Sequence, residues 1–304
     1  MLALVGAALW ALRGQLPAVL RIARTTHPRW SLVVAASSIV LLTYALLIEG
    51  WRRVLGSLGG TLAYLDAARI WFVSNLARLL PGAFWQLGAM SEMARRRGVP
   101  VAVSTGSAML ITIVNLFSGV AVAGAFASSA LHDRLGTKTW LILGIGAAAL
   151  AVAPVVVPRV GAIVRRLTGR EIVMPRFSVA AVFIAIGSTT IAWLAYGVAF
   201  WLMTRALLPG DARSLAGCIA LYTISYIAGL LNPAPAGIGA AEGMMVYLAP
   251  QLGVATSAEA LVLSVAVRVW RTVLEILPGL IALPFARSSL DDVANQPSRG
   301  SRIP

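Results

Sequence analysis

Charged residues are scarce in this sequence, and long polar stretches are missing. Charged residues make up 12% of the 304 residues, whereas hydrophobic residues make up 59%, and the mean hydropathy is +0.85. A soluble domain has about 25% charged and about 45–50% apolar residues. No segment outside the apolar runs is long enough for a soluble catalytic domain. The composition therefore predicts an all-α, polytopic membrane protein.

Acidic residues are especially few. The chain has 11 Asp and Glu residues against 25 Lys and Arg residues, which gives a formal net charge of +14. Such an excess could suggest nucleic acid as a partner, but in a membrane protein it is typical of cytoplasmic loops and of contact with anionic lipid headgroups. We therefore expect a membrane-lipid partner and no nucleic acid.

Cysteine and histidine are nearly absent. The lone Cys218 cannot form an internal disulfide, and His27 and His132 lack the spacing of metal ligands. No catalytic triad pattern, phosphate-binding loop or nucleotide fingerprint occurs. The sequence predicts no metal site, no cofactor and no catalytic residue, so an enzymatic role is the less favoured one.

The apolar runs predict about six to eight membrane spans, because one span needs about 20 residues. The opening apolar run ends at Arg13, without the small-residue cleavage site of a signal peptide. Residues 1–286 are expected to form one transmembrane domain, and residues 287–304 a disordered polar tail. The expected spans of full length are 30–50, 101–131, 140–157, 178–208 and 258–285.

Basic clusters indicate the orientation of part of the chain. Arg95 to Arg97 and the arginine-rich segment 159–176 are assigned to the cytoplasm. The first span has arginines on both flanks, however, so charge alone leaves its direction and the side of the C-terminus open.

Two stretches break the apolar pattern with proline and glycine. One lies in the stretch from Ala63 to Trp85, which is broken at Pro81 and Gly82; the other runs from Asn232 to Glu242 and contains Gly237 and Gly239. Proline removes a backbone donor and glycine loosens a helix, so such breaks are stable only inside protein or beside a water-filled cavity. We predict two broken or re-entrant elements, with Gln86 and Asn232 as polar residues beside them.

The two broken stretches resemble each other when gaps are allowed. Each contains an asparagine, a proline, a glycine, a glutamate and a Gly-Val pair before a long span. Chance similarity in an Ala- and Gly-rich chain is the competing explanation. A true repeat would correspond to discontinuous helices that build a site near the membrane midplane.

The last span carries three charges on one helical face. Arg268, Arg271 and Glu275 are three and four residues apart, and charges are costly against lipid, so this face is expected to look into the bundle. Arg271 and Glu275 could simply neutralise each other. Arg268 is then left to pair with Glu242 or to hold a phosphate. Glu242 itself is interpreted either as the cap of a half-helix or as a proton or headgroup site.

Several motifs occur in a characteristic order, and together they resemble a known family. The motifs are Trp51-Arg52-Arg53, Leu80-Pro81-Gly82-Ala83-Phe84-Trp85-Gln86, Arg95 to Val99, Pro235-Ala236-Gly237-Ile238-Gly239-Ala240-Ala241-Glu242 and Arg268. In this order they resemble the transmembrane domain of the lysylphosphatidylglycerol synthase family. Many relatives have an arginine and a glutamate just after the first Pro-Gly, and an arginine at the position of Ala241. The resemblance therefore leaves Glu242 and Arg268 as the expected charged pair.

The resemblance implies a flippase-like protein of a bacterial cytoplasmic membrane. Its polar cavity would bind or translocate an anionic or polyprenyl-linked lipid, and a separate lipid-modifying enzyme or glycosyltransferase would be a partner. The soluble synthase domain is missing, so lipid synthesis is not implied. The alternatives are an enzyme or accessory subunit in phospholipid or glycan modification, for which Asp66 and Glu92 are the only carboxylate candidates, and a noncatalytic membrane partner.

Overall fold

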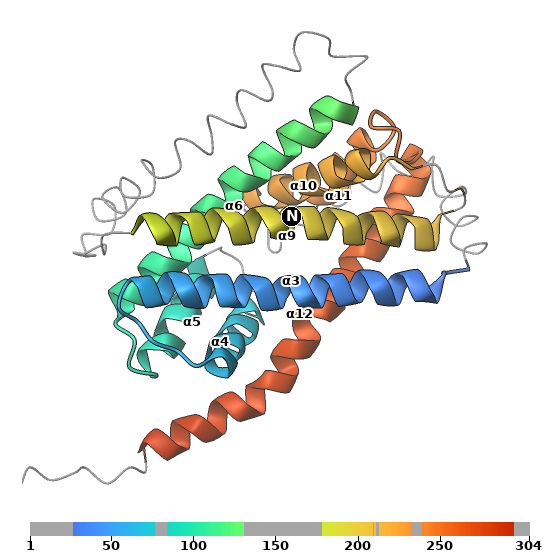
Figure 1. The fold of residues 1–304 in the computed structure, drawn as a ribbon. Coiled ribbons are helices and arrows are strands. Elements are labelled where there is room, and N and C mark those ends of the chain that lie inside the picture. The colour runs from blue at the N-terminus through green and yellow to red at the C-terminus, as the bar shows by residue number, and fades with distance from the viewer. Residues whose placement is uncertain are drawn as a thin grey trace, which may run out of the picture.

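The computed structural model describes residues 27–76, 84–130, 178–208, 210, 213–232 and 239–294. In these ranges it contains helices and no strand, which confirms the predicted all-α class. The helices in chain order are α3 (Trp30–Ser57), α4 (Tyr64–Leu76), α5 (Phe84–Arg95), α6 (Val101–Ala130), α9 (Val179–Leu207), α10 (Leu215–Leu231), α11 (Ala240–Leu248) and α12 (Ser257–Ala294) (Figure 1).

Three of the described helices are long and apolar enough to cross a membrane. They are α3, α9 and the part of α6 from Val101 to Ser128, each 28 or 29 residues long with mean hydropathy between 1.8 and 2.3. A helix of 28 residues is about 42 Å long, more than the about 30 Å of the hydrocarbon core. The protein is therefore an integral membrane protein. The predicted span 140–157 lies outside the described residues, so the total number of spans stays a prediction.

Helices α3 and α9 pack side by side and run in opposite directions (Figure 1). The backbone N–H of Arg29, just before α3, donates to the carbonyl of Ala206 near the end of α9, at 3.0 Å. Nearer the other end of the pair, Gly50 lies so close to α9 that a Cβ would meet Ser188 Oγ at 2.7 Å. Small residues allow this close approach between membrane helices.

Helix α3 continues past the expected end of the first span and carries Trp51, Arg52 and Arg53 within it. Trp51 is fully buried, and its indole N–H donates to Ser107 Oγ of α6 at 3.0 Å. A tryptophan followed by two arginines at the end of a span predicts an aromatic and basic anchor at the membrane interface. That expectation is wrong for Trp51, because the side chain packs between helices and has its polar group satisfied within the protein.

The helices form two sets with the same order. A long helix (α3 or α9) is followed by a helix before a break (α4 or α10), a short helix (α5 or α11) and a second long helix (α6 or α12). The sets interlock, since α4 packs on α12 and α10 packs on α6. Because α3 and α9 are antiparallel, the two sets have opposite orientations, as in an inverted repeat.

The joints within the two sets match in detail. Gly98 and Gly253 both have positive φ, +81° and +65°. The valine after each glycine is buried, and its backbone N–H bonds to the carbonyl of an alanine at the end of the short helix, at 3.1 Å for Val99 and 2.9 Å for Val254. These features support the repeat that the sequence suggested. Glu242 precedes Gly253 by the same number of residues as Leu87 precedes Gly98. In this repeat Glu242 therefore corresponds to Leu87 and not to Glu92.

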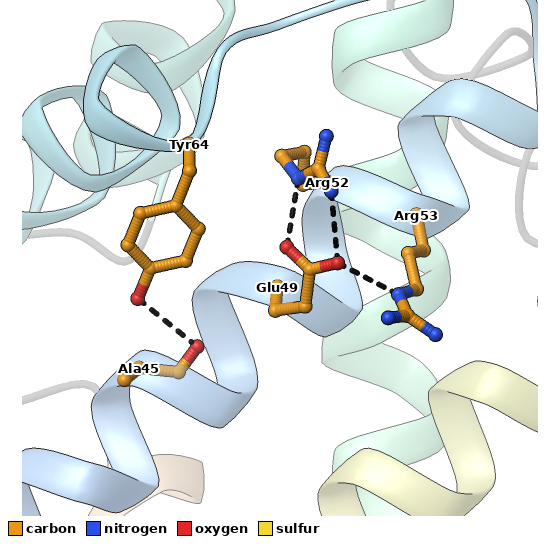
Figure 2. Close-up of polar contacts among 5 residues, drawn as sticks. All are labelled: Ala45, Glu49, Arg52, Arg53 and Tyr64. Carbon is orange, nitrogen blue, oxygen red and sulfur yellow. Dashed lines mark hydrogen bonds and ion pairs between the residues drawn. The ribbon is translucent and has the colours of Figure 1, made fainter.

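A basic pole forms where α3 ends, α4 begins and α5 turns into α6. Its arginines share the few carboxylates there, two arginines to each. Figure 2 shows the first of these groups, in which Glu49 accepts hydrogen bonds from Arg52 and Arg53 at 2.7–2.9 Å. The other groups are Glu92 with Arg95 and Arg96, and Asp66 with Arg69 and Arg97. The pole therefore keeps a net positive charge, as the positive-inside rule expects of a cytoplasmic face.

Helix α12 is longer than predicted. It runs to Ala294, well past residue 286, where the transmembrane domain was expected to end, and it bends along its length (Figure 1). Pro278 lies inside the helix and removes one backbone donor, and proline inside a helix is a common cause of bending. The residues between 287 and 294 include no proline or glycine, so nothing in their sequence ends the helix. Residues 295–304 lie outside the described ranges.

The tight contact between α9 and α10 gives a test of this packing. A Cβ on Gly197 would lie 2.5 Å from Ile219 Cγ1 and 2.9 Å from the Ile219 Cα, whereas a Cβ on Gly187 of the same helix would meet nothing within 4 Å. We expect Gly197→Ala to lower the free energy of unfolding by about 1–3 kcal/mol through overpacking. Gly187→Ala should be neutral or stabilising, by up to about 1 kcal/mol. Thermal unfolding in detergent measures both, and equal midpoints for the two variants would contradict the close contact.

Candidate functional site

The charged and the apolar residues of α12 lie on different faces of the helix. Val265, Val269 and Val273 are 52–60% exposed, as expected of side chains that face lipid. Arg271 and Glu275 are only 24% and 23% exposed. The helix thus turns its apolar face outward and its charged face toward α3, α10 and α11, which confirms the orientation expected from the cost of charge in lipid.

Glu242 and Arg268 form an ion pair between α11 and α12. Arg268 Nε donates to Glu242 Oε1, and both side chains are partly buried, at 31% and 21% exposure. The other oxygen, Oε2, accepts from the backbone N–H of Gly239 at 2.8 Å, at the start of α11. Gly239 has a φ of +90°, which only glycine adopts without strain. Glu242 therefore both caps the half-helix after the break and holds the arginine of the last helix.

Arg271 and Glu275 form a second ion pair, one turn apart on α12. Arg271 Nη2 lies 2.7 Å from Glu275 Oε1, and the guanidinium stacks over the ring of Tyr226 of α10, 4.5 Å from its centroid. The hydroxyl of Tyr44 of α3 donates to Glu275 at 3.5 Å. The pair thus touches two other helices and is more than the local neutralisation that its spacing alone suggests.

Aromatic residues surround the second pair. Tyr44 contacts Phe72 and Tyr196 edge to face, with ring centroids 5.9 and 6.2 Å apart. Tyr226 packs edge to face on Trp193, at 5.2 Å. Sequence reasoning did not find these tyrosines. A signal existed, because tyrosine in the middle of a span needs a hydrogen-bond partner, but no spacing rule links it to a charge many residues away.

The first break is bridged by neutral side chains. The amide of Gln86, at the start of α5, donates to Asn75 Oδ1, at the end of α4, at 2.5 Å. Asn232 ends α10, and its backbone N–H bonds to the carbonyl of Gly229. Pro81, Gly82 and Gly237 lie outside the described residues, so their predicted role stays a prediction.

The two carboxylates considered for an enzyme are each tied to their own arginines. Asp66 lies 2.7 Å from Arg97, and Glu92 accepts hydrogen bonds from Arg95 and Arg96. These hydrogen bonds lower the pKa of Glu92 to about 2, whereas a general acid needs a raised one. In the part of the chain that the structure describes, His, Cys, Asp and Glu form no group that could hold a metal ion.

The family model of the lysylphosphatidylglycerol synthase TM region matches residues 1–279 of the chain. The matched region covers both breaks and the charged face of α12, and it confirms the resemblance that the motifs suggested. No curated protein matches the chain.

The Glu242–Arg268 pair can be tested by separating its two roles. Glutamine at position 242 can keep the capping hydrogen bond but not the charge, so Glu242→Gln should destabilise the protein less than Glu242→Ala. We expect about 1–3 kcal/mol for the lost ion pair, below the about 3–5 kcal/mol of a fully buried pair, because both groups are partly exposed. Unfolding of Glu242→Gln, Arg268→Gln and the double variant measures the coupling. If the two single effects simply add, the side chains do not interact.

Proposed function

The chain belongs to the lysylphosphatidylglycerol synthase transmembrane family, and we propose that it moves an anionic lipid between leaflets through the polar site beside α12. Membership makes it an integral membrane protein that acts on lipids. The observation that carries the proposal is that Arg268 and Arg271, on the inward face of α12, form ion pairs with Glu242 of α11 and Glu275 of α12. Charges inside a membrane protein commonly line the path of a substrate.

The chemistry of the pairs suits a lipid phosphate. A guanidinium binds carboxylate and phosphate oxygens with the same planar fork of donors. Glu242 and Glu275 can therefore hold Arg268 and Arg271 while no lipid is bound, and a headgroup phosphate can replace them as the partner. Arg268 is the more accessible of the two arginines, at 31% side-chain exposure against 24%. In this scheme Arg268 meets the headgroup first and Arg271 next.

The helix order supports movement across the membrane. Inverted repeats with broken helices are found in transporters, where the rocking of one half against the other opens a central site to each side in turn. Here the second break contributes Glu242 to one ion pair, and α10, the helix before that break, contributes Tyr226 to the other. A change in the angle between α10, α11 and α12 would thus alter both pairs together.

The substrate class follows from the charge. A lipid with a phosphate, either a phospholipid or a polyprenyl-linked one, fits two arginines, and a separate lipid-modifying enzyme or glycosyltransferase would supply or use it. A bacterial cytoplasmic membrane is the expected location.

Transport gives the direct test. Purified protein in liposomes should speed the movement of fluorescent phosphatidylglycerol between leaflets, measured by chemical quenching of the outer leaflet. Arg271→Gln should slow this movement about tenfold or more, because a hydrogen bond to a charged group contributes about 1.5–3 kcal/mol.

Arg96→Gln is the matched control, since Arg96 is 49% exposed at the basic pole and pairs with Glu92, away from α12. It should leave the rate unchanged. Equal rates for Arg271→Gln and the unaltered protein, or no movement above that in protein-free liposomes with several anionic lipids, would contradict the proposal.

A further inference from the structure

An apolar groove runs along the outer surface between α3, α4 and α12. Its cavity volume is about 430 Å³, and its lining includes Leu41 of α3, Leu65 and Phe72 of α4, and Leu277 of α12. Leu65 and Leu277 are 67% and 54% exposed, so the walls of the groove are open to the surroundings. Because these helices lie in a membrane protein, the groove faces lipid, and the volume is in the range of about 300–1,000 Å³ of small-molecule sites.

Among the residues whose side chains the structure describes, Arg69 is the one charged residue that lines the groove. It lies 3.4 Å from Asp66, which also pairs with Arg97 at 2.7 Å. The three residues together keep one net positive charge at the start of α4, which lies at the basic pole. An apolar groove with a positive group at its membrane-surface end matches an amphipathic anion.

We propose that this groove binds an anionic phospholipid, with an acyl chain along Phe72 and Leu277 and the phosphate at Arg69. Arginine near a membrane surface attracts anionic headgroups, and an apolar groove that faces the bilayer can pack against a hydrocarbon chain. The ligand class is a glycerophospholipid of the leaflet at the basic pole. Arg69 acts here as a binding residue and not only as the ion-pair partner of Asp66.

The groove adjoins the charged site described above. Phe72 lines the groove and contacts Tyr44, which donates to Glu275. Leu274, next to Glu275 in α12, also lines the groove. A lipid held in the groove would therefore place its acyl chain at Phe72, which Tyr44 separates from Glu275. The idea that a lipid enters the charged site from the groove rests on the proposed function. Lipid binding in the groove itself does not rest on it.

Photolabelling tests the binding directly. The full chain is reconstituted in phosphatidylcholine vesicles with a phosphatidylglycerol that carries a photoreactive diazirine in its acyl chain, and the labelled peptides are mapped by mass spectrometry. Residues 65–72 and 274–282 should label more strongly than the outer face of α9, where Phe183 and Ile191 are 68% and 54% exposed. Arg69→Gln should lower groove labelling about two- to fivefold, as expected for a partly exposed charge contact.

Arg53→Gln is the control, because Arg53 lies at the same pole, is 64% exposed and does not line the groove. It should leave the labelling unchanged. Equal labelling of the groove and of α9 would mean ordinary surrounding lipid and would overturn the proposal, as would equal labelling by a phosphatidylcholine probe. Crosslinking of the groove to a second copy of the chain would also overturn it.

Measuring both groove labelling and lipid movement between leaflets in the same vesicles tests this inference and the proposed function separately. Groove labelling without lipid movement between leaflets leaves the binding site standing and removes the transport role. Lipid movement without preferential groove labelling removes the site and leaves the transport role standing.

Discussion

The energetic cost of charge in hydrocarbon governs the arrangement of this protein. An arginine at the centre of a membrane helix costs at least about 2.5–3.5 kcal/mol, so it must be paired or shielded. Arg268 and Arg271 are both paired, one with Glu242 of another helix and one with Glu275 of its own. The fold as a whole can be understood as the means of providing those partners, since α11 brings Glu242, α3 brings Tyr44 and α10 brings Tyr226.

The break before α11 serves the same requirement. A continuous helix through residues 232–242 would have no free backbone donors for Glu242 to cap. Helix α10 ends at its C-cap Asn232, and helix α11 begins at its N-cap Gly239. Helix α11 therefore has an N-terminus of its own, where a carboxylate is stabilised by backbone N–H groups and the helix dipole. The start of α11 thus fixes the carboxylate that holds Arg268.

The long helices and the charged face of α12 could be predicted from the sequence, whereas the contacts between helices could not. Hydropathy found α3, α6 and α9 to within a few residues at most ends, apart from the extra turns of α3 after Gly50. Helical spacing placed the three charges of α12 on one face, and their cost in lipid turned that face inward. The partners Tyr44 and Tyr226 were not predicted, because contacts between helices depend on packing that no spacing encodes. Trp51 was misplaced for the same reason: an aromatic residue beside arginines has the pattern of an interface anchor, and only its contact with Ser107 shows that it is internal.

The central claim is that water reaches the charged face of α12 while the opposite face meets lipid, as the proposed transport role requires. Thiol accessibility tests it most directly, with Cys218 replaced by alanine and single cysteines placed at Arg268 or at Val269. A charged, membrane-impermeant thiol reagent needs water and a thiolate to react. The account predicts that the cysteine at position 268 reacts in liposomes and that the cysteine at position 269, on the exposed apolar face, does not. Equal reaction at both positions, or reaction only at position 269, would contradict it.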